Sequence, residues 1–407
     1  MKKFSLLLLI LSFLFLPGSS FEERNDEFKI IKEDGIPVAL NPAYPVPLKK
    51  SPKDIIFNDE LTLGQVEGDP NYVFSEFISY TVDDKENMYV LDWRAKTIRK
   101  FDKNGKYLLS FGGEGQGPGE FTFPEEIRLL SNGHLMVFEG EAQRYSFFTQ
   151  EGKFVKSGRF LKLMSPPFFG FSSGNFIATN IQRESKRTVV ITGLFDAKSE
   201  LLTSLHEREM EPYKPWPSQD DVSARARRIA ERFSRIAFRP SVTLTVDSKE
   251  KIHFAFTDKF EIKVYSSDGL LKKILRTELP MLPVEKKDRE GYISYWLPRD
   301  LTTWNSMSKQ FQNKIKSLIR FPDKKPAFLS IIPMDSDYMM VVRDRSFKRD
   351  SLIDIFDSSG RFIIEKKLNF NIKSGLCRKG KLYTIHEDED GNQYVKRFRY
   401  ALSRKEH

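Results

Sequence analysis

Residues 83–121 read DDKENMYVLDWRAKTIRKFDKNGKYLLSFGGEGQGPGEF, and this stretch decides the fold. Its apolar runs, Met88 to Leu91, Ile98 to Phe101 and Tyr107 to Phe111, have the length and composition of β-strands. Short polar turns such as Asp102 to Gly105 separate them. Strands joined by such tight turns form an antiparallel meander, so we predict that these residues fold as one small sheet.

The same pattern returns along the chain. Further apolar strands that follow polar turns are Leu135 to Phe138, Phe176 to Thr179, Ile252 to Phe256, Tyr338 to Val342 and Leu382 to Ile385. Each is followed by a second apolar strand and most by a turn rich in Asp, Ser and Gly. A unit that recurs in this way is typical of propellers and other repeat architectures. Six copies predict six blades.

The sixth copy stops after the strand Tyr394 to Tyr400 and lacks a fourth strand. The missing strand is predicted at the other end of the chain, because Leu61 to Gly68 resembles the end of the first unit, Leu109 to Gly115. Circular closure removes the exposed edges of a sheet. The sequence therefore predicts an all-β fold, a six-bladed β-propeller of four-stranded antiparallel blades over residues 56–402, closed by an N-terminal strand.

The segments Tyr89 to Trp93, Ile98 to Asp102 and Phe111 to Phe121 resemble an NHL repeat. This resemblance implies a bacterial exported six-bladed propeller. Later units lack the Gly-Gly link and the Trp. The glycines from Gly112 to Gly119 match neither the G-x-G-x-x-G spacing nor a Gly-Lys-Ser/Thr loop. We expect them to form a turn between blades in which glycine adopts positive φ.

The N-terminus predicts export. Lys2 and Lys3 precede an apolar run from Leu6 to Leu16 and small residues up to Ser20, the pattern of a signal peptide over residues 1–20. That run is too short for a permanent transmembrane anchor. We therefore expect a periplasmic or extracellular monomer with an extended segment at 21–55 and a tail at 403–407. Cys377 is the only cysteine, so no intramolecular disulfide can form.

Two insertions interrupt the strand pattern, at residues 206–240 and 280–326, and both have apolar residues at helical spacing. In the first, a helix start near Asp221 is followed by a face that carries Arg225, Arg228, Arg232 and Arg235. The second contains an aromatic-rich stretch that includes Tyr292, Tyr295 and Trp296. Each insertion joins the outer strand of one blade to the inner strand of the next, so both are predicted to cap the same mouth of the central channel.

One residue per blade, at the exit of the second strand, is a candidate binding residue, because propellers often assemble a site from one side chain per blade at the channel mouth. Those that are polar, and that we predict as ligand-binding residues, are Asp92, Glu139, Asn180, Arg343 and His386. The corresponding residue of the fourth unit is Phe256. A purely structural role is the alternative, since such an Asp often fixes the following turn by accepting backbone N–H groups. His253, inside a strand, is interpreted as a packed core residue.

The leading functional hypothesis is a non-catalytic binding or scaffold module for a protein, peptide or glycan. No HExxH motif is present, no cofactor is expected, and an exported protein seldom meets nucleic acid. The alternative, which the resemblance implies, is a metal-assisted lyase or hydrolase with a divalent cation such as calcium at Asp92, Glu139, Asn180 and His386. A third hypothesis follows from the net charge of +10, namely attachment of the arginine-rich helix face to anionic envelope polymers.

Overall fold

A computed structural model of the protein describes residues 27–75, 78–140, 142–160, 164–183, 187–210, 221–301, 303–345, 350–388 and 390–404. The predicted signal peptide lies outside these residues. Among them, no helix is both long and apolar enough to span a membrane.

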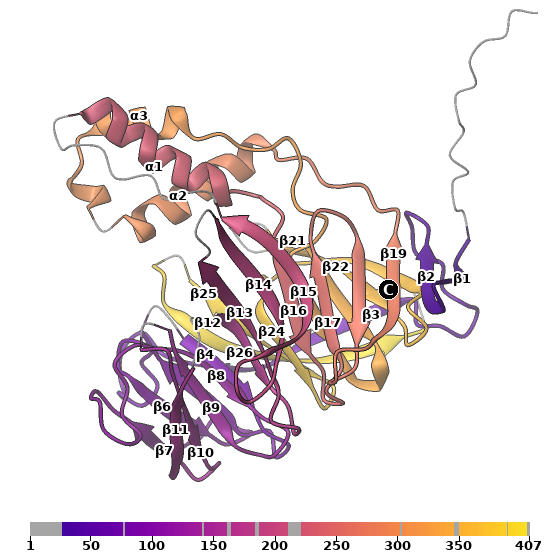
Figure 1. Ribbon diagram of the computed structural model, residues 1–407, viewed down its shortest axis with the longest axis horizontal. Helices are drawn as coiled ribbons and strands as arrows, with labels where there is room; N and C mark the ends of the chain where they lie inside the picture. Colours follow the sequence, from indigo (N-terminus) through magenta and orange to yellow (C-terminus); the bar gives the residue numbers. More distant parts are fainter. Residues whose placement is uncertain are drawn as a thin grey trace, which may run out of the picture.

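Six antiparallel sheets of four consecutive strands, or three strands and a distant fourth, surround a common axis (Figure 1). Blade 1 contains β4 (Ile78–Val82), β5 (Met88–Asp92), β6 (Thr97–Phe101) and β7 (Tyr107–Gly112). Blade 2 contains β8 (Pro124–Leu129), β9 (Leu135–Glu139), β10 (Arg144–Phe148) and β11 (Phe154–Arg159). Blade 3 contains β12 (Met164–Gly170), β13 (Phe176–Arg183), β14 (Thr188–Phe195) and β15 (Leu201–Met210).

The second half of the ring repeats this plan. Blade 4 contains β16 (Val242–Val246), β17 (Ile252–Phe256), β18 (Glu261–Tyr265) and β19 (Leu271–Thr277). Blade 5 contains β20 (Ser330–Pro333), β21 (Met339–Arg345), β22 (Ser351–Phe356) and β23 (Phe362–Leu368). Blade 6 contains β24 (Lys373–Arg378), β25 (Lys381–Glu387), β26 (Gln393–Ser403) and the N-terminal β3 (Asp54–Leu63).

The N-terminal strand closes the ring, which confirms the prediction of closure. β3 pairs antiparallel with β26 from Val395 opposite Leu63 to Ser403 opposite Asp54. The pairing supplies the outer strand that the last blade lacks. It also ties the two ends of the described chain together, so that unfolding of either end exposes a long sheet edge.

One buried apolar cluster lies between each pair of neighbouring blades. The cluster between blades 6 and 1 shows that the ring is continuous across the closure, because Val82 and Val90 of blade 1 pack with Tyr383 and Ile385 of blade 6. Strands such as β5 and β9 are buried along their whole length because both of their faces meet a neighbouring blade. Long apolar runs are therefore suited to these central strands.

The polar turns that the repeat predicted are held by side chains of Asp. In the turn after β6, Oδ1 of Asp102 accepts the backbone N–H groups of Asn104 and Lys106, at 2.8 and 2.9 Å. Asp196 and Asp357 hold the equivalent turns of blades 3 and 5 in the same way. A short carboxylate that satisfies two backbone donors explains why Asp recurs at this position.

The Gly-Gly link after β7 adopts the backbone conformation expected of a turn. Gly112 has φ +92° and Gly113 has φ +144°. A Cβ atom at Gly112 would lie 2.5 Å from the ring of Phe121, so no larger residue fits there without movement of that buried ring. The glycines therefore serve the passage from blade 1 to blade 2.

The extended segment predicted for residues 21–55 contains an ordered hairpin, β1 (Lys29–Glu33) and β2 (Ile36–Asn41). Asp34 and Gly35, with φ of 47° and 81°, form its two-residue turn, and an Asp-Gly pair favours such a turn. β2 pairs parallel with β19, which extends blade 4 to six strands. The side chain of Asn41 fastens the hairpin between blades 4 and 5 by bonding Gly360 O at 2.9 Å and Phe362 N at 2.7 Å.

Both insertions form helices that pack together on one side of the ring, as predicted (Figure 1). The helices are α1 (Val222–Ile236), α2 (Lys286–Asp300), the short η1 (Trp304–Ser306) and α3 (Lys309–Leu318). A further short helix, η2 (Asp335–Asp337), lies in blade 5. β15 continues to Met210, so the first insertion begins later than residue 206. We call α1, α2, η1 and α3 the helical cap.

The cap has its own apolar core. Ala226, Ile229 and Phe233 of α1 meet Tyr292 of α2 and Ile315 of α3. Side chains of Asp221 and Ser308 begin α1 and α3 by accepting backbone N–H groups at 2.7 and 3.3 Å. The two insertions, which are separated by a whole blade in the sequence, thus form one unit.

Candidate functional site

Asp92, the first predicted binding residue, is buried at the end of β5 and engages both of its oxygen atoms. Oδ1 accepts from Ser75 Oγ at 2.6 Å and from Ala95 N at 3.0 Å. Oδ2 accepts from Ser75 N at 3.1 Å and from Arg99 Nη1 at 3.0 Å. Burial opposes ionisation of this carboxyl, but the hydrogen bonds from Ala95, Ser75 and Arg99 outweigh it and lower its pKa.

Glu139 has the same role at the end of β9. Its Oε1 accepts from Thr122 N at 2.7 Å, Thr122 Oγ1 at 3.1 Å and Phe123 N at 3.3 Å. Its Oε2 pairs with Arg144 Nε at 2.5 Å. Asp92 and Glu139, each at the end of a second strand, thus bind both the link that enters their blade and an arginine of the third strand. The alternative structural interpretation given for Asp92 describes both residues.

Arg343, near the end of β21, is also buried but lies in a less balanced group. Its Nη1 binds Glu365 Oε2 at 2.5 Å, whereas its Nε lies 3.6 Å from Asp354 Oδ2. Among the residues that the structure describes, neither oxygen of Asp354 has a hydrogen-bond donor, although the side chain is wholly buried. Burial, opposed by Arg343 and reinforced by the charge of Glu365, raises the pKa of Asp354 to about 8.

Asn180 and His386 occupy corresponding strands of blades 3 and 6. Asn180 is buried in β13, opposite Ile191 of β14. His386 is half-buried in β25, opposite Tyr394 of β26 and directly before Glu387. At the equivalent place in blade 4, the ring of Phe256 stacks on His206, with ring centroids 4.5 Å apart.

Asp92, Glu139 and Arg343 each have their own set of partners in the described part of the chain. Asp92, Glu139 and Arg343 bind groups of their own blade or of the link that precedes it, and no described contact joins two of these three. Their contacts hold the second strands in place at this face. For a ligand to bind the carboxylate of Asp92 or Glu139, several buried hydrogen bonds of that carboxylate would have to break.

These carboxylates do not fit the metal site of the alternative hypothesis. All four oxygen atoms of Asp92 and Glu139 accept hydrogen bonds, and each carboxylate pairs with an arginine, a cation that would repel a second cation nearby. Within the residues that the structure describes, no group of three or more His, Cys, Asp or Glu side chains is arranged to hold a metal ion.

His253 lies in β17 and takes part in a turn. Its Nε2 is 3.2 Å from Oδ2 of Asp247, whose Oδ1 accepts the backbone N–H groups of Lys249 and Lys251. Tyr89 contacts Asp83 in the same manner in blade 1, through a hydroxyl at 3.0 Å. His253 therefore stands where other blades place a packed aromatic residue, in agreement with its interpretation as a core residue.

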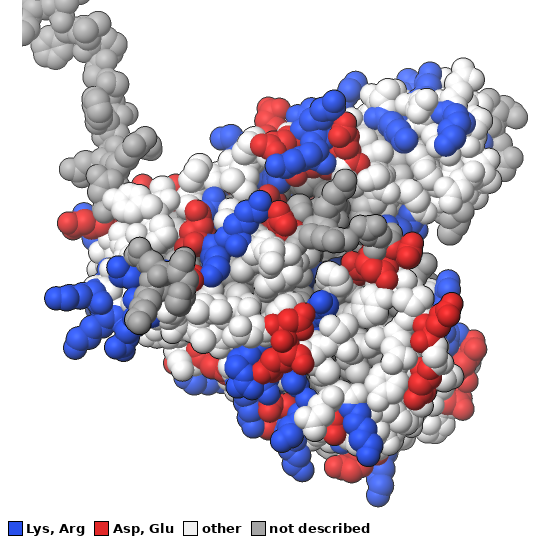
Figure 2. Space-filling view, turned by 180° about the vertical axis from the view of Figure 1, so that it is seen from behind, with Lys and Arg blue, Asp and Glu red and all other residues white. Residues whose placement is uncertain are grey.

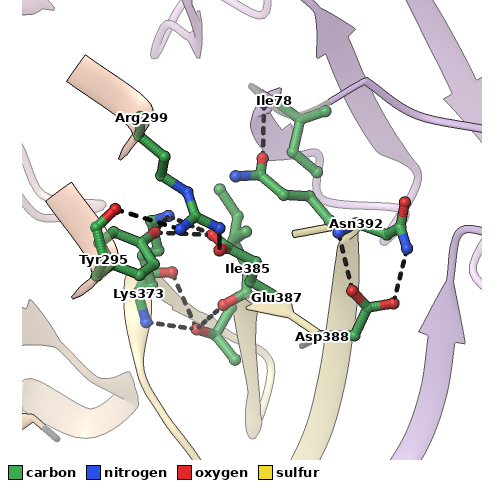
Figure 3. Close-up of polar contacts among 10 residues, drawn as sticks. Ile78, Tyr295, Arg299, Lys373, Ile385, Glu387, Asp388 and Asn392 are labelled. Atoms are coloured by element: carbon green, nitrogen blue, oxygen red, sulfur yellow. Dashed lines mark hydrogen bonds and ion pairs between the residues drawn. The ribbon is translucent and has the colours of Figure 1, made fainter. Parts of the chain in front are cut away.

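A polar junction that was not predicted joins the cap to blade 6 (Figure 3). Glu387, at the end of β25, accepts from Tyr295 Oη at 2.8 Å and from Arg299 Nη2 at 2.5 Å, both on α2. Lys373 Nζ, at the start of β24, lies 3.3 Å from the same carboxylate. We call Tyr295, Arg299, Lys373 and Glu387 the cap junction.

Aromatic and cationic groups surround the cap junction. The guanidinium of Arg299 lies 4.0 Å from the centre of the Tyr295 ring, and the exposed ring of Trp296 meets Tyr295 edge-on at 5.1 Å. Trp296 is 40% exposed, which is unusual for so large an apolar side chain. An aromatic surface beside fixed cations can bind a peptide or a sugar ring by stacking and by charge-assisted hydrogen bonds.

Asp388, beside Glu387, binds residues at the start of β26. Its carboxylate accepts from Asn392 N at 2.9 Å and from Asn392 Nδ2 at 3.0 Å (Figure 3). It also accepts from Tyr394 Oη at 2.7 Å. Gln393, which follows Asn392, accepts the backbone N–H of Ile78 through its side-chain Oε1 at 3.0 Å and so connects blade 6 to blade 1. The strand that follows the cap junction is therefore tied to blade 1.

A second contact fixes the cap to blade 5. Lys325, which is buried, binds Asp288 Oδ1 of α2 at 3.0 Å and Asp344 Oδ2 of β21 at 2.8 Å. Together with the cap junction, it holds α2 across the ends of two second strands. The cap thus covers the face on which the second strands end, and Figure 1 shows it on that side of the ring.

Two signals in the sequence pointed toward the cap junction. Glu387 directly follows His386, a predicted binding residue, and Tyr295 and Trp296 belong to the aromatic-rich stretch of the second insertion. The contact itself could not be predicted, because α2 follows blade 4 in the sequence but reaches blade 6 in space.

A family model described as a 6-bladed beta-propeller matches residues 78–160, which are blades 1 and 2. The fold is similar to that of a candidate exported protein from Bacteroides fragilis, with a TM-score of 0.51 and 10% identity over 90% of this chain and 99% of that chain. A member of the duf4221 family from Bacteroides vulgatus has a TM-score of 0.46 and 10% identity over 86% of this chain and 99% of that chain. Virginiamycin B lyase from Staphylococcus aureus has a TM-score of 0.41 and 10% identity over 84% and 99%. The chain matches no curated protein. At such identities the likeness concerns the fold alone.

Proposed function

We propose that this six-bladed propeller is an exported binding or scaffold module, in the periplasm or outside the cell, for a protein, peptide or glycan. The ligand binds at the face that carries the cap, beside the cap junction. The observation that carries the proposal is the placement of Trp296 and Arg299 on a helix that two ionic contacts fasten to blades 5 and 6. Binding surfaces in propellers are commonly built from connections on one face of a rigid scaffold.

Each predicted residue has a place in this proposal. His386 lies at the rim, next to Glu387, and is the member of the predicted set that we assign to ligand contact. Asp92, Glu139 and Arg343 support the face by fixing the ends of second strands, whereas Asn180 lies within β13, which continues to Arg183. A binding role requires no catalytic group, and the oxygens of Glu387 already accept from several donors.

The test is a binding screen with the exported form of the protein on peptide and glycan arrays. For any ligand found, Trp296→Ala is expected to weaken binding at least about tenfold, because an exposed aromatic anchor is removed. Leu108→Ala, which truncates a residue that is 45% exposed on the outer strand of blade 1, is the matched control and is expected to change nothing. Equal binding by wild type and Trp296→Ala would contradict the proposal.

Elemental analysis addresses the alternative of a metal-assisted lyase or hydrolase. A binding module is expected to carry no stoichiometric divalent ion after dialysis against a mild chelator. A tightly held calcium or zinc ion, with loss of a lyase or hydrolase activity on its removal, would replace the binding proposal by the enzymatic one.

A further inference from the structure

The outer part of the cap is strongly cationic. Between residues 303 and 320 the sequence contains Lys309, Lys314, Lys316 and Arg320 and no acidic residue. α1 and the residues after it add six arginines against Asp221 and Glu231. Figure 2 shows blue side chains on the outer end of the cap, with little red among them.

The fold presents the lysines of α3 to solvent. Gln312 and Ile315 turn inward to the cap core, whereas Lys309, Asn313 and Lys316 are exposed at spacings i, i+4 and i+7. That spacing places the three on one face of the helix, over about 10 Å. Lys314 is also exposed but lies about 140° around the helix from Lys309. The ammonium of Lys316 lies 5.7 Å from the centre of the buried Trp304 ring, which helps to fix its position.

These lysines differ from three lysines elsewhere in the chain. Lys325, Lys366 and Lys381 each bind a carboxylate. In the part of the chain that the structure describes, Lys309, Lys314 and Lys316 make no ion pair. An array of cations without acidic neighbours raises the local positive potential and attracts a polyanion.

α1 continues this surface. The guanidinium of Arg225 lies 6.0 Å from the centre of the Phe311 ring on α3, and the N–H of Arg320 binds Ser234 Oγ of α1 at 2.8 Å. The cationic residues of the two helices therefore belong to one packed unit. We call the exposed residues of α3, with Arg225 and the exposed Arg320, the cap cationic surface.

The polar side chains between the lysines indicate the kind of polyanion. Gln310, Asn313 and Ser317 are exposed on α3 and can bond hydroxyl groups. A helix that lies on a membrane would instead present large apolar residues. Val222 and Ile236 are exposed, but they stand at opposite ends of α1, about 20 Å apart, and form no patch.

We propose that the cap cationic surface binds an acidic polysaccharide, whose carboxylate or sulfate groups meet the lysines and arginines and whose hydroxyl groups meet the amides. Clusters of basic residues of this kind recognise anionic polymers through charge. This surface is separate from the cap junction. The two proposals can therefore fail independently.

The experiment measures binding of the exported form of the protein to polygalacturonate and to heparin in 50 mM salt. Wild type is expected to bind at least one of them, and to bind less tightly in 500 mM salt. The variant Lys309→Gln/Lys314→Gln/Lys316→Gln is expected to lose at least about tenfold in affinity. Neutral dextran is expected not to bind.

The matched control is Lys103→Gln/Lys106→Gln/Lys153→Gln, which removes the same charge from exposed turns of blades 1 and 2. It is expected to bind within about twofold of wild type. Absence of binding to both polymers, or equal losses in the two triple variants, would overturn the proposal. Tighter binding to phosphatidylglycerol vesicles or to DNA through the same three lysines would also overturn it, in favour of those partners.

Discussion

Blades 1 and 2 differ from blades 5 and 6 in how the end of the second strand is held. In blades 1 and 2 a buried carboxylate accepts backbone N–H groups of the link and pairs with one arginine. In blade 5 a buried arginine stands at this place, and its partner Asp354 has no hydrogen-bond donor. In blade 6 the carboxylate, Glu387, binds side chains of the cap.

The difference shows that the polar group at the end of the second strand can have two roles, either holding its own blade or holding an insertion. Where the carboxylate binds its own link, the blade is complete by itself, and residues 78–160 are the part that the family model matches. In blade 6, Glu387 binds Tyr295 and Arg299 of the cap and so holds an insertion. The capped half of the ring is thus less regular from blade to blade, and it carries the helical insertions on its surface.

The largest expected effect is in the regular half. Glu139→Ala should destabilise the protein by about 3–5 kcal/mol, because it leaves buried donors and the half-buried Arg144 without their carboxylate. Urea denaturation measures the loss. Glu114→Ala, which removes a largely exposed partner of Lys96, is the control and should cost less than about 0.5 kcal/mol. Similar losses in the two variants would contradict the structural role of Glu139.

Asp92 and Asp354 should make stability depend on pH in opposite directions. The pKa of Asp92 is lowered in the folded state, so its contribution is present above the unfolded pKa and is lost as pH falls. The pKa of Asp354 is raised to about 8, so its contribution is present below the unfolded pKa and is lost as pH rises toward 8.

Asp354→Asn should remove that second dependence. Between pH 5 and pH 8, wild type should lose on the order of 1 kcal/mol per pH unit relative to the variant. Urea midpoints of both proteins across this range test the prediction. Parallel pH profiles would show that Asp354 is ionised in the folded protein at neutral pH.

A smaller effect is expected at the link between blades 1 and 2. Gly112→Ala should cost about 2 kcal/mol, because it combines a positive φ with a clash against the buried Phe121 ring. Gly380→Ala in blade 6 has a φ of +72° but open space around the new methyl group, and should cost about 1 kcal/mol. The melting temperatures compare the two, and equal shifts would mean that the contact with Phe121 is easily relieved.

The smallest effect should be local to the cap. Glu387→Gln weakens the contacts with Arg299 and Lys373 and should cost about 1 kcal/mol. Hydrogen exchange should become faster in α2 and remain unchanged in β5. Asp59→Asn, which removes a more exposed partner of Lys396, is the control and should leave exchange in α2 as it is. Faster exchange throughout the ring would show that Glu387 supports the propeller itself.

Much of the fold could be predicted because its signals are local. Asp102, Asp196 and Asp357 mark turns through bonds to residues two to four positions away, and the strands between them repeat at regular intervals. The hairpin of residues 29–41 escaped prediction although Asp34 and Gly35 signal its turn, since it pairs with β19, more than 200 residues away. The predicted ring of site residues was harder, because Asp92 binds its own link, whereas in blade 6 Glu387, the residue after the predicted His386, binds the cap.

The sequence by itself determined the number of blades, the ring closure and the presence of two helical insertions, because strand periodicity, turn residues and helix spacing are properties of neighbouring residues. Only the tertiary structure decided that the insertions form one cap, that α2 reaches Glu387, and that Asp92 and Glu139 face inward. Those features depend on which segments meet in space, and side-chain contacts between distant segments leave no periodic pattern in the sequence.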